Sequence, residues 1–286
     1  ADVYVGFQNG DTPRWVMFFW EISEFDHKWE PFHATPYETA DYSGMRCAIP
    51  WGRGTGPLAQ SEQALVKGRE AWKKIGVLVR QTQPWPTSIY TGTLYDQSSS
   101  VVIPRDPKDL PAVLAFCRSP DFPKALLSIA NAMKFTNSTF TSVPFDVELW
   151  RSKAHAMFPN GLPVPQTEDP TQWIFHGNPA AAASGTAIHV ALARLCGYRW
   201  PYEYDPQAHV SDNTRAWIAK AAELPAGDTD GLLGVPAVAG EKSLADRLRT
   251  YLAAAFGADW SDALERRLVA EADEVLDKKT ARDGSL

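Results

Sequence analysis

The chain has 286 residues, of which 44% are hydrophobic and 22% charged, and its formal net charge at pH 7 is -6. This length allows two domains with buried cores, since globular domains have roughly 100 to 200 residues. The sequence contains no apolar run near the roughly 20 residues that span a bilayer and no signal-peptide pattern, which excludes a membrane partner and favours a cytoplasmic location.

The first half of the chain is expected to be rich in β-structure. Its short apolar runs are broken by Gly, Pro, Thr and Ser, which is typical of strands joined by turns. A helix is expected among them at 61–74, where apolar residues follow Ser61 at roughly helical spacing. The predicted strands are 15–22, 76–80, 88–95 and 100–103, with a tight turn at 90–93.

Helical patterns dominate from residue 109 onward, and several of them begin with Ser, Asp or Thr as a helix cap. Proline is too frequent around 159–179 for regular structure, which predicts a linker or an extended arm. The predicted helices are 109–118, 122–134, 180–195, 214–224, 243–256 and 261–277. The expected fold class is α+β, with a β-rich domain containing a few helices at 1–155, a Pro-rich linker at 156–180 and a mostly helical subdomain at 181–286.

The cysteines do not form a pattern with a chemical role. Cys47, Cys117 and Cys196 lie far apart and no Cys-x-x-Cys pair occurs. We therefore expect neither a disulfide framework nor a metal site, and reduced thiols of the kind usual in the cytoplasm.

Positive charge is concentrated in one part of the chain. Lys and Arg balance Asp and Glu at 16 against 16 in residues 1–160, whereas residues 161–286 have 12 against 18. Within the first part, the segment 46–80 has only two acidic residues against seven basic ones: Arg46, Arg53, Lys67, Arg69, Lys73, Lys74 and Arg80. A basic face on an acidic chain suits contact with double-stranded DNA.

Two parts of this basic segment predict contacts with phosphates. The glycines around Arg53, in the run 51–56, could bring backbone amides close to a phosphate, although a solvated loop has the same composition. A second set could position a duplex through its backbone, or form an ordinary solvated helix face: Lys67, Arg69, Lys73 and Lys74.

Base reading is the hypothesis for the run that follows. Arg pairs with guanine and Gln with adenine in the major groove, which makes Arg80, Gln81 and Gln83 candidates. On a strand, Arg80 would face away from the two glutamines, so only one set could reach bases. An ordinary polar strand end is the alternative. Lys134 and Asn137 are further candidates for DNA contact, or else belong to a structural corner.

The eleven Trp residues allow a different interpretation. Most of them, including Trp20, lie in apolar contexts that indicate a core. Trp51 and Trp85 could instead stack on bases or on sugar rings. Stacking on sugar rings would suit a secreted carbohydrate-binding module, which is kept as an alternative function.

Four stretches of the sequence carry a resemblance to a known family. KFTNSTFTSVPFDVELW at 134–150 is the most specific of them, and the others are YVGFQNGDTPRWVMFFWEI at 4–22, VVIPRDPKDLPAVLAFCRSPDF at 101–122, and DPTQWIFHGNPAAAA at 169–183 with LARLCGYRWP at 192–201. Together they resemble the adenine-specific (N6) DNA methyltransferases of the phage-defence systems BREX and DISARM and their type IIG restriction-modification relatives. The stretches match the region after the catalytic domain, so the chain looks like a C-terminal piece of a longer enzyme.

The resemblance implies a target-recognition region rather than a catalytic one. The glycine-rich turn that binds S-adenosylmethionine and the Asn-Pro-Pro-aromatic motif that grips a flipped adenine are not found, and the nearest sequence, HGNPA at 176–180, reads as a turn. We therefore expect no catalytic residue and no cofactor in this chain, with S-adenosylmethionine held by the parent enzyme. The implied partners are double-stranded DNA, the methyltransferase catalytic domain of the same parent protein and other subunits of the defence system. A protein-interaction scaffold within a defence complex is the alternative.

Overall fold

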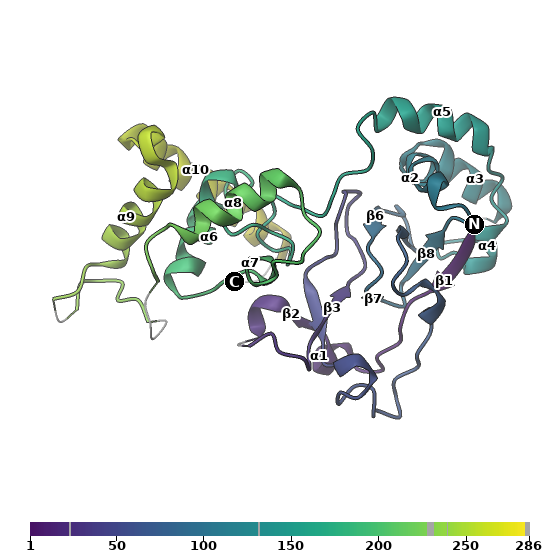
Figure 1. Cartoon of the computed structure of the whole chain (residues 1–286), viewed down its shortest axis with the longest axis horizontal. Coiled ribbons are helices and arrows are strands. Elements are labelled where there is room, and N and C mark those ends of the chain that lie inside the picture. The colour runs from purple at the N-terminus through teal and green to yellow at the C-terminus, as the bar shows by residue number, and fades with distance from the viewer. Residues whose placement is uncertain (23, 131, 228–231, 239, 284–286) are drawn as a thin grey trace. The chain divides into compact units, whose positions relative to one another are not determined.

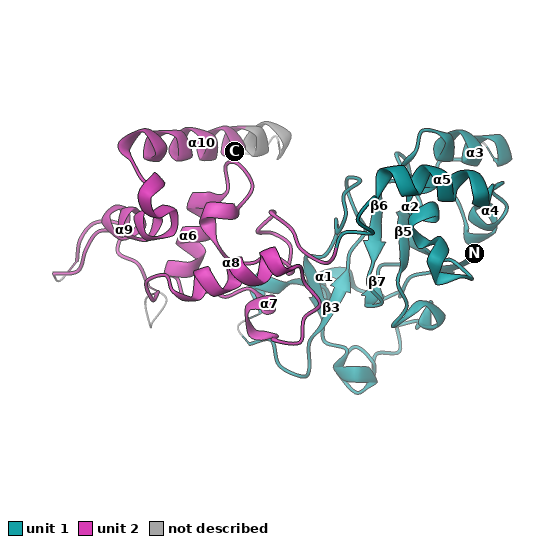
Figure 2. Cartoon of the chain, turned by 45° about the horizontal axis from the view of Figure 1, so that its top comes forward, with its two compact units in different colours: residues 1–163 teal, residues 164–286 magenta. Residues whose placement is uncertain are grey.

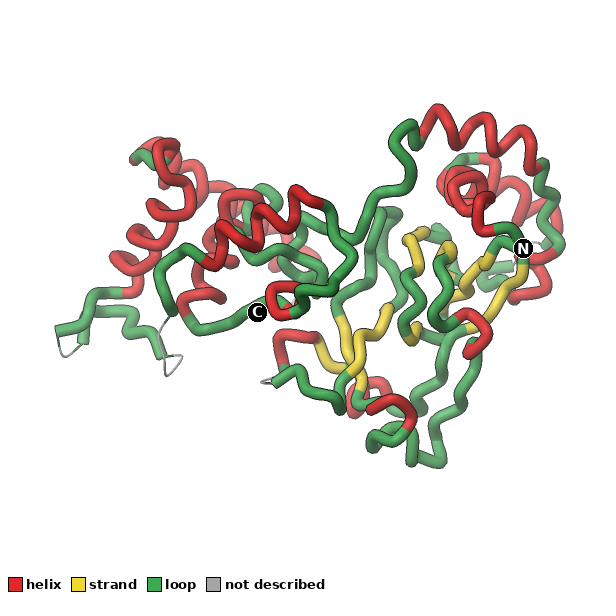
Figure 3. The backbone as a smooth tube through the Cα atoms, viewed as in Figure 1, coloured by secondary structure: helices red, strands yellow, loops and turns green. Residues whose placement is uncertain are grey.

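The computed structural model describes residues 1–22, 24–130, 132–227, 232–238 and 240–283. The chain divides into two compact units, which we call unit 1, residues 1–163, and unit 2, residues 164–286 (Figure 2). Unit 1 contains two β-sheets with helices, whereas helices are the main regular elements of unit 2 (Figure 3). The predicted α+β fold class is confirmed.

The described residues of unit 1 form two four-stranded sheets. The first has the order β1-β8-β5-β6 and is antiparallel, and the second has the order β2-β4-β3-β7, with β3 and β7 parallel. Their bounds are β1 Asp2–Val5, β2 Met17–Phe18, β3 Glu30–His33, β4 Cys47–Ile49, β5 Gly76–Arg80, β6 Thr87–Tyr90, β7 Leu94–Tyr95 and β8 Ser99–Ile103.

Three of the four strands of the first sheet are buried on both faces, which explains their sequences. Every residue of β6 and β8 is buried, as are the first four of β5, so these strands read as continuous apolar or small-residue runs. α2 packs on β5 and β6, α5 packs on α2, and α4 packs on β1 (Figure 1). The helices of unit 1 are α1 Thr12–Trp15, α2 Leu110–Arg118, α3 Asp121–Ile129, α4 Asn137–Thr141 and α5 Val147–Met157.

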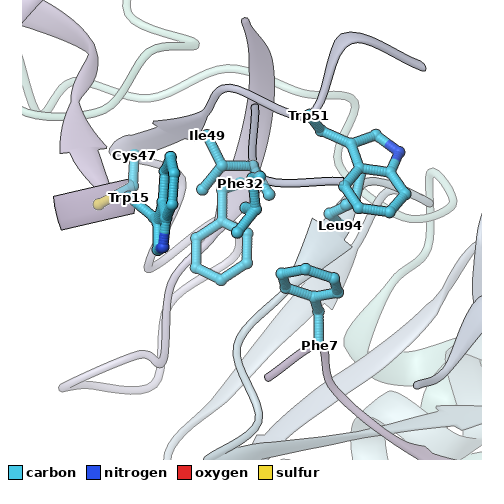
Figure 4. Packing of buried hydrophobic residues seen from close by; sticks show 8 residues of the cluster. Phe7, Trp15, Phe32, Cys47, Ile49, Trp51 and Leu94 are labelled. Carbon is cyan, nitrogen blue, oxygen red and sulfur yellow. The ribbon is translucent and has the colours of Figure 1, made fainter. Parts of the chain in front are cut away.

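The second sheet is packed through aromatic side chains. Phe7 meets Trp51 edge to face, with ring centroids 5.4 Å apart, in a cluster that also contains Phe32 and Leu94 (Figure 4). Edge-to-face contacts of this kind add to the stabilisation from buried area. This packing holds the short strands β3, β4 and β7 in place.

Unit 2 is built on α6, α9 and α10, whose apolar faces form its core. Ser243 caps α9 by accepting a backbone N–H bond, as predicted, whereas the helix expected to open at Thr214 begins at Asp212 and is capped by Ser211. Its helices are α6 Ala187–Leu195, α7 Pro201–Tyr204, α8 Asp212–Ala222, α9 Leu244–Phe256 and α10 Asp262–Asp283. None of the described helices combines the length and the apolar character needed to cross a membrane.

Residues 164–180, which the sequence predicts to be part of a linker, belong to unit 2. Ile174 and Phe175 are buried there, and the Trp200 indole donates a hydrogen bond to the Pro170 carbonyl at 2.9 Å. Proline prevents regular hydrogen bonding along this segment but not its burial.

The helix expected at 61–74 is wrong, and only Arg69–Ala71 forms a 3₁₀ turn there. Leu65 exchanges backbone hydrogen bonds with Gln8 instead, and Gly68 and Lys73 have φ angles of 70° and 61°, which a right-handed helix does not allow. The strand expected at 15–22 is reduced to β2, and the helix expected at 122–134 ends at Ile129.

Candidate nucleic-acid interface

One groove of unit 1, with a volume of about 690 Å³, brings together three of the predicted DNA-contact residues. Arg46, Arg80 and Lys134 all line it, although they come from separate parts of the sequence. We call it the basic groove. Its other walls come from β2, β3 and the loops around them, and from the turn that precedes β8.

Backbone pairing holds Lys134 close to Arg80. Arg80 is the last residue of β5, and beyond it Thr82 forms an antiparallel bridge with Lys134. The Phe135 amide donates to the Gln81 carbonyl at 3.0 Å, which fixes the same pairing. Arg80 Nε donates to Thr82 Oγ1 at 2.7 Å, and its two terminal guanidinium nitrogens have no partner among the described residues.

Arg46 is held by the second sheet. It lies directly before β4, in which Cys47 pairs with Phe18 of β2, and its carbonyl accepts the Phe19 amide at 3.2 Å. Its guanidinium lies over the Tyr37 ring, 4.5 Å from the centroid. The guanidinium also donates to the Thr35 carbonyl at 3.4 Å, so the charge of Arg46 lies against an exposed aromatic ring.

The cations of the basic groove are not neutralised by ion pairs. Among the described residues, Arg46, Arg80 and Lys134 have no salt bridge to a carboxylate. Two carboxylates line the groove, but each accepts local hydrogen bonds: Glu21 from the Phe18 amide at 2.8 Å, and Asp96 from the Ser98 amide at 2.7 Å. The groove therefore has three positive and two negative charges, a net charge of +1, and its cations are free of ion pairs among the described residues.

Gln81 has a structural role rather than the predicted base-reading one. Its side chain is only 4% exposed and donates from Nε2 to Ser100 Oγ at 3.1 Å, and Ser100 in turn donates to Asn137 Oδ1 at 2.8 Å. This network occupies the Gln81 amide and the Asn137 carbonyl oxygen inside unit 1. Gln83 is exposed, because the chain leaves the strand after Arg80 and turns at Thr82.

The glycine-rich loop around Arg53 does not offer its amides to a phosphate. The amides of Gly52, Gly54, Thr55 and Gly56 donate to backbone carbonyls, and the Arg53 amide donates to the Glu30 carboxylate. An internal anion therefore occupies the position that the sequence suggested for a phosphate.

The remaining basic candidates are exposed but lie outside the basic groove: Lys67, Arg69, Lys73 and Lys74. Because the predicted helix is not formed, these four side chains do not share one helical face. Arg69 lies over the Trp72 ring at 5.7 Å, and the Lys73 amide donates to the Gly92 carbonyl at 2.8 Å.

The exposed aromatic residues differ from those that the sequence indicated. Trp51 and Trp85 are buried, whereas Trp20, which was expected in a core, is 42% exposed. Trp20 stacks on Phe18, with centroids 4.5 Å apart and planes 5° apart, and Phe18 lines the basic groove. The apolar neighbours of Trp20 in the sequence gave no signal of its exposure.

The buried histidines are part of the fold. Burial lowers the pKa of His33 to about 4, and its Nε2 lies 2.8 Å from the Ser43 carbonyl. His176 is likewise buried, and its Nδ1 accepts the Asn178 amide within the turn expected at 176–180. No cluster of three or more His, Cys, Asp or Glu side chains suited to a metal occurs in the described part of the chain.

A buried ion pair forms the polar centre of unit 2. Arg194 Nη1 donates to both carboxylate oxygens of Glu203, at 2.6 and 2.8 Å. The same guanidinium donates to the Tyr251 hydroxyl at 2.7 Å and to the Ala221 carbonyl at 3.0 Å. Through these hydrogen bonds, Arg194 connects α6 with α7, α8 and α9, which gives it a structural role.

Comparison with known proteins gives no relative: no family model matches the chain, and no curated protein matches it.

Proposed function

We propose that unit 1 binds double-stranded DNA through the basic groove, as the target-recognition region of an adenine-N6 DNA methyltransferase of the phage-defence or type IIG restriction-modification kind. The observation that carries this proposal is the convergence of Arg46, Arg80 and Lys134, without ion pairs, on one groove. The resemblance of four stretches of the sequence to that family supplies the enzyme class.

The groove suits a phosphate backbone for electrostatic reasons. Each Lys or Arg that meets a phosphate releases condensed counterions, so affinity falls with salt in proportion to the number of contacts. Three such contacts correspond to a slope of about -2.7 in a plot of log affinity against log salt. The exposed Gln83 lies close in the sequence to Arg80 and is the remaining candidate for reading a base.

The methyl donor belongs to another part of the parent enzyme in this proposal. S-adenosylmethionine needs a glycine-rich turn with open backbone amides after a strand. The turn that follows β4 uses its amides internally, including the one that donates to Glu30. The described residues there do not fit the cofactor, so this chain contributes DNA contacts while a catalytic domain in the same cytoplasmic protein carries out methyl transfer.

The test is duplex DNA binding measured by fluorescence anisotropy at several salt concentrations. The triple variant Arg46→Ala, Arg80→Ala, Lys134→Ala is expected to lose most of the salt-dependent affinity. The control removes the same charge from the basic segment outside the groove, as Lys67→Ala, Arg69→Ala, Lys74→Ala, and is expected to keep the slope of the native chain.

The opposite result, with the control losing affinity and the groove variant keeping it, would place the interface outside the basic groove. Absence of salt-dependent binding by the native chain would contradict the proposed function and favour the scaffold alternative.

A further inference from the structure

We propose that the stacked pair Phe18 and Trp20 receives an unpaired base of the DNA held in the basic groove. This inference rests on the proposed function and adds to it the form of DNA that binds most tightly. We call these two side chains the aromatic pair.

The aromatic pair is exposed although its members are large and apolar. Phe18 is 39% exposed and Trp20 is 42% exposed, and their rings are almost parallel. A nucleobase would stack as a third ring on an outer face of this pair. Aromatic rings accept a nucleobase in this way with little regard to sequence, because every base has a flat π-face.

The pair is held in a fixed position, so a base would meet a preformed surface. Phe18 is anchored by its pairing with Cys47, and the 3₁₀ turn that carries Trp20 is closed by the hydrogen bond from the Phe18 amide to Glu21. Phe19, between the two, is buried and meets Trp20 edge to face at 5.1 Å. The side chains thus lose little freedom when a ligand binds.

Arg46 lies next to the pair, as does one carboxylate, that of Glu21, which accepts the Phe18 amide. Phe18 lines the same groove as Arg46, and the Arg46 carbonyl accepts the amide of Phe19. Tyr37, which is 72% exposed, lies under the Arg46 guanidinium in the same groove. An apolar stacking surface beside unpaired cations matches the chemistry of a base with its flanking phosphates.

A base inside an intact duplex cannot reach such a surface, because both of its faces are covered by neighbouring base pairs. The unpaired base can come from a single strand or from an extrahelical base in a duplex, and the two sources share the same stacking chemistry. In a duplex, extrusion of the base costs a few kcal/mol, least where the base is already unpaired.

The experiment compares four probes by fluorescence anisotropy: an intact duplex, the same duplex with one extrahelical adenine, the same duplex with one abasic position, and one strand alone. The native chain is expected to bind the extrahelical duplex about 5- to 150-fold more tightly than the intact one. The abasic duplex, which is equally deformable but lacks a base to stack, is expected to show no such gain. Tighter binding of the single strand than of the extrahelical duplex identifies single-stranded DNA as the source.

Two variants and a control separate stacking from folding. Trp20→Ala is expected to bring the ratio between extrahelical and intact duplex close to one, and Trp20→Phe to retain most of it. Phe25→Ala removes an exposed aromatic ring outside the aromatic pair and is expected to keep the native ratio. Circular dichroism of each variant checks that it is folded.

Equal affinity of the native chain for the intact and extrahelical duplexes would overturn the inference while leaving DNA binding by the groove in place. The same holds if Trp20→Ala keeps the preference. Failure of the proposed function is a different result, namely no salt-dependent binding of any of the four probes.

Discussion

Replacing Arg194 by Met tests whether the ion pair in unit 2 is as important for folding as its burial indicates. The side chain of Arg194 is 3% exposed and that of Glu203 is 8% exposed. Arg194→Met keeps a similar apolar stem but removes every side-chain donor, so the Glu203 carboxylate loses its charged partner while it stays buried, and it keeps only the hydrogen bond from the Trp200 amide at 3.1 Å. The Tyr251 hydroxyl and the Ala221 carbonyl also lose a donor.

Loss of one partner of a buried pair costs more than the pair contributes, because the remaining charge is neither solvated nor compensated. We expect Arg194→Met to lower the free energy of unfolding by about 3 to 5 kcal/mol. The double variant Arg194→Met, Glu203→Leu leaves no buried charge and is expected to recover part of that loss.

Urea denaturation followed by far-UV circular dichroism measures this difference, since unit 2 is largely helical. With an m-value of about 1 to 3 kcal/mol per M, the expected loss moves the midpoint of the affected transition down by at least roughly 1 M. Arg249→Met is the matched control, because Arg249 also bonds a carboxylate, Glu265, at 2.8 Å but its side chain is 55% exposed. A loss below about 1 kcal/mol for Arg194→Met, in the range of surface ion pairs, would refute the reasoning.

Three further predictions concern buried groups. Burial lowers the pKa of His33 and of His176 from 6.5 to about 4, so the unfolded chain takes up protons on them below pH 6.5 before the folded chain does. The stability that they contribute is present above pH 6.5 and falls as the pH approaches 4, by about 3 kcal/mol for each histidine. His176→Phe should weaken the pH dependence of the urea midpoint between pH 6.5 and 4. An unchanged pH dependence would contradict the lowered pKa of His176. Gln81→Ala should lower the free energy of unfolding by about 1 kcal/mol in the same assay, because the Gln81 amide bonds Ser100. The preferred DNA sequence should stay unchanged, and an altered preference would restore the base-reading role of Gln81. Burial raises the pKa of the Cys47 thiol to about 11. A thiol reagent should therefore modify the exposed Cys196 in the folded chain and reach the buried Cys47 and Cys117 only after denaturation. Fast labelling of three thiols in the native chain would disagree with this burial.

Elements with strong local patterns were predictable from the sequence. The run at Gly76–Arg80 is apolar and β-branched, and it forms β5 with those bounds. The helix predicted at 109–118 is α2, starting at Leu110 with Pro111 in its first turn. In both, the local preference and the tertiary packing favour the same structure.

The predictions from the sequence failed where a few backbone angles or a distant partner determine the structure. The apolar spacing in 61–74 indicates a helix, but the φ angles of Gly68 and Lys73 and the pairing of Leu65 with Gln8 take the chain elsewhere. Trp20 was placed in a core because its neighbours are apolar, yet the 3₁₀ turn buries Phe19 and directs Trp20 outward. Gly68 is a local signal of the first outcome, since a glycine inside a helical pattern weakens the expectation of a helix, whereas the outward position of Trp20 has no such signal.

The sequence indicated individual residues of the candidate interface, but not that they come together in one groove. Arg46, Arg80 and Lys134 were each named from charge or from the resemblance, together with other cations that lie outside the groove. Their convergence depends on the pairing of Phe18 with Cys47 and of Thr82 with Lys134, which connect distant parts of the chain. Charge counting along a sequence cannot detect such pairings.

The way the basic groove is built has an evolutionary consequence. Main-chain bonds, such as those from Phe135 to Gln81 and from Phe19 to Arg46, set the position of its cations, while the cationic side chains themselves support little of the fold. If the groove binds DNA as proposed, exchanging these side chains would alter its preference with little cost in folding. Such an arrangement lets new binding preferences arise by single substitutions, and it offers Arg46, Arg80 and Lys134 as positions for a randomised library on an unchanged scaffold.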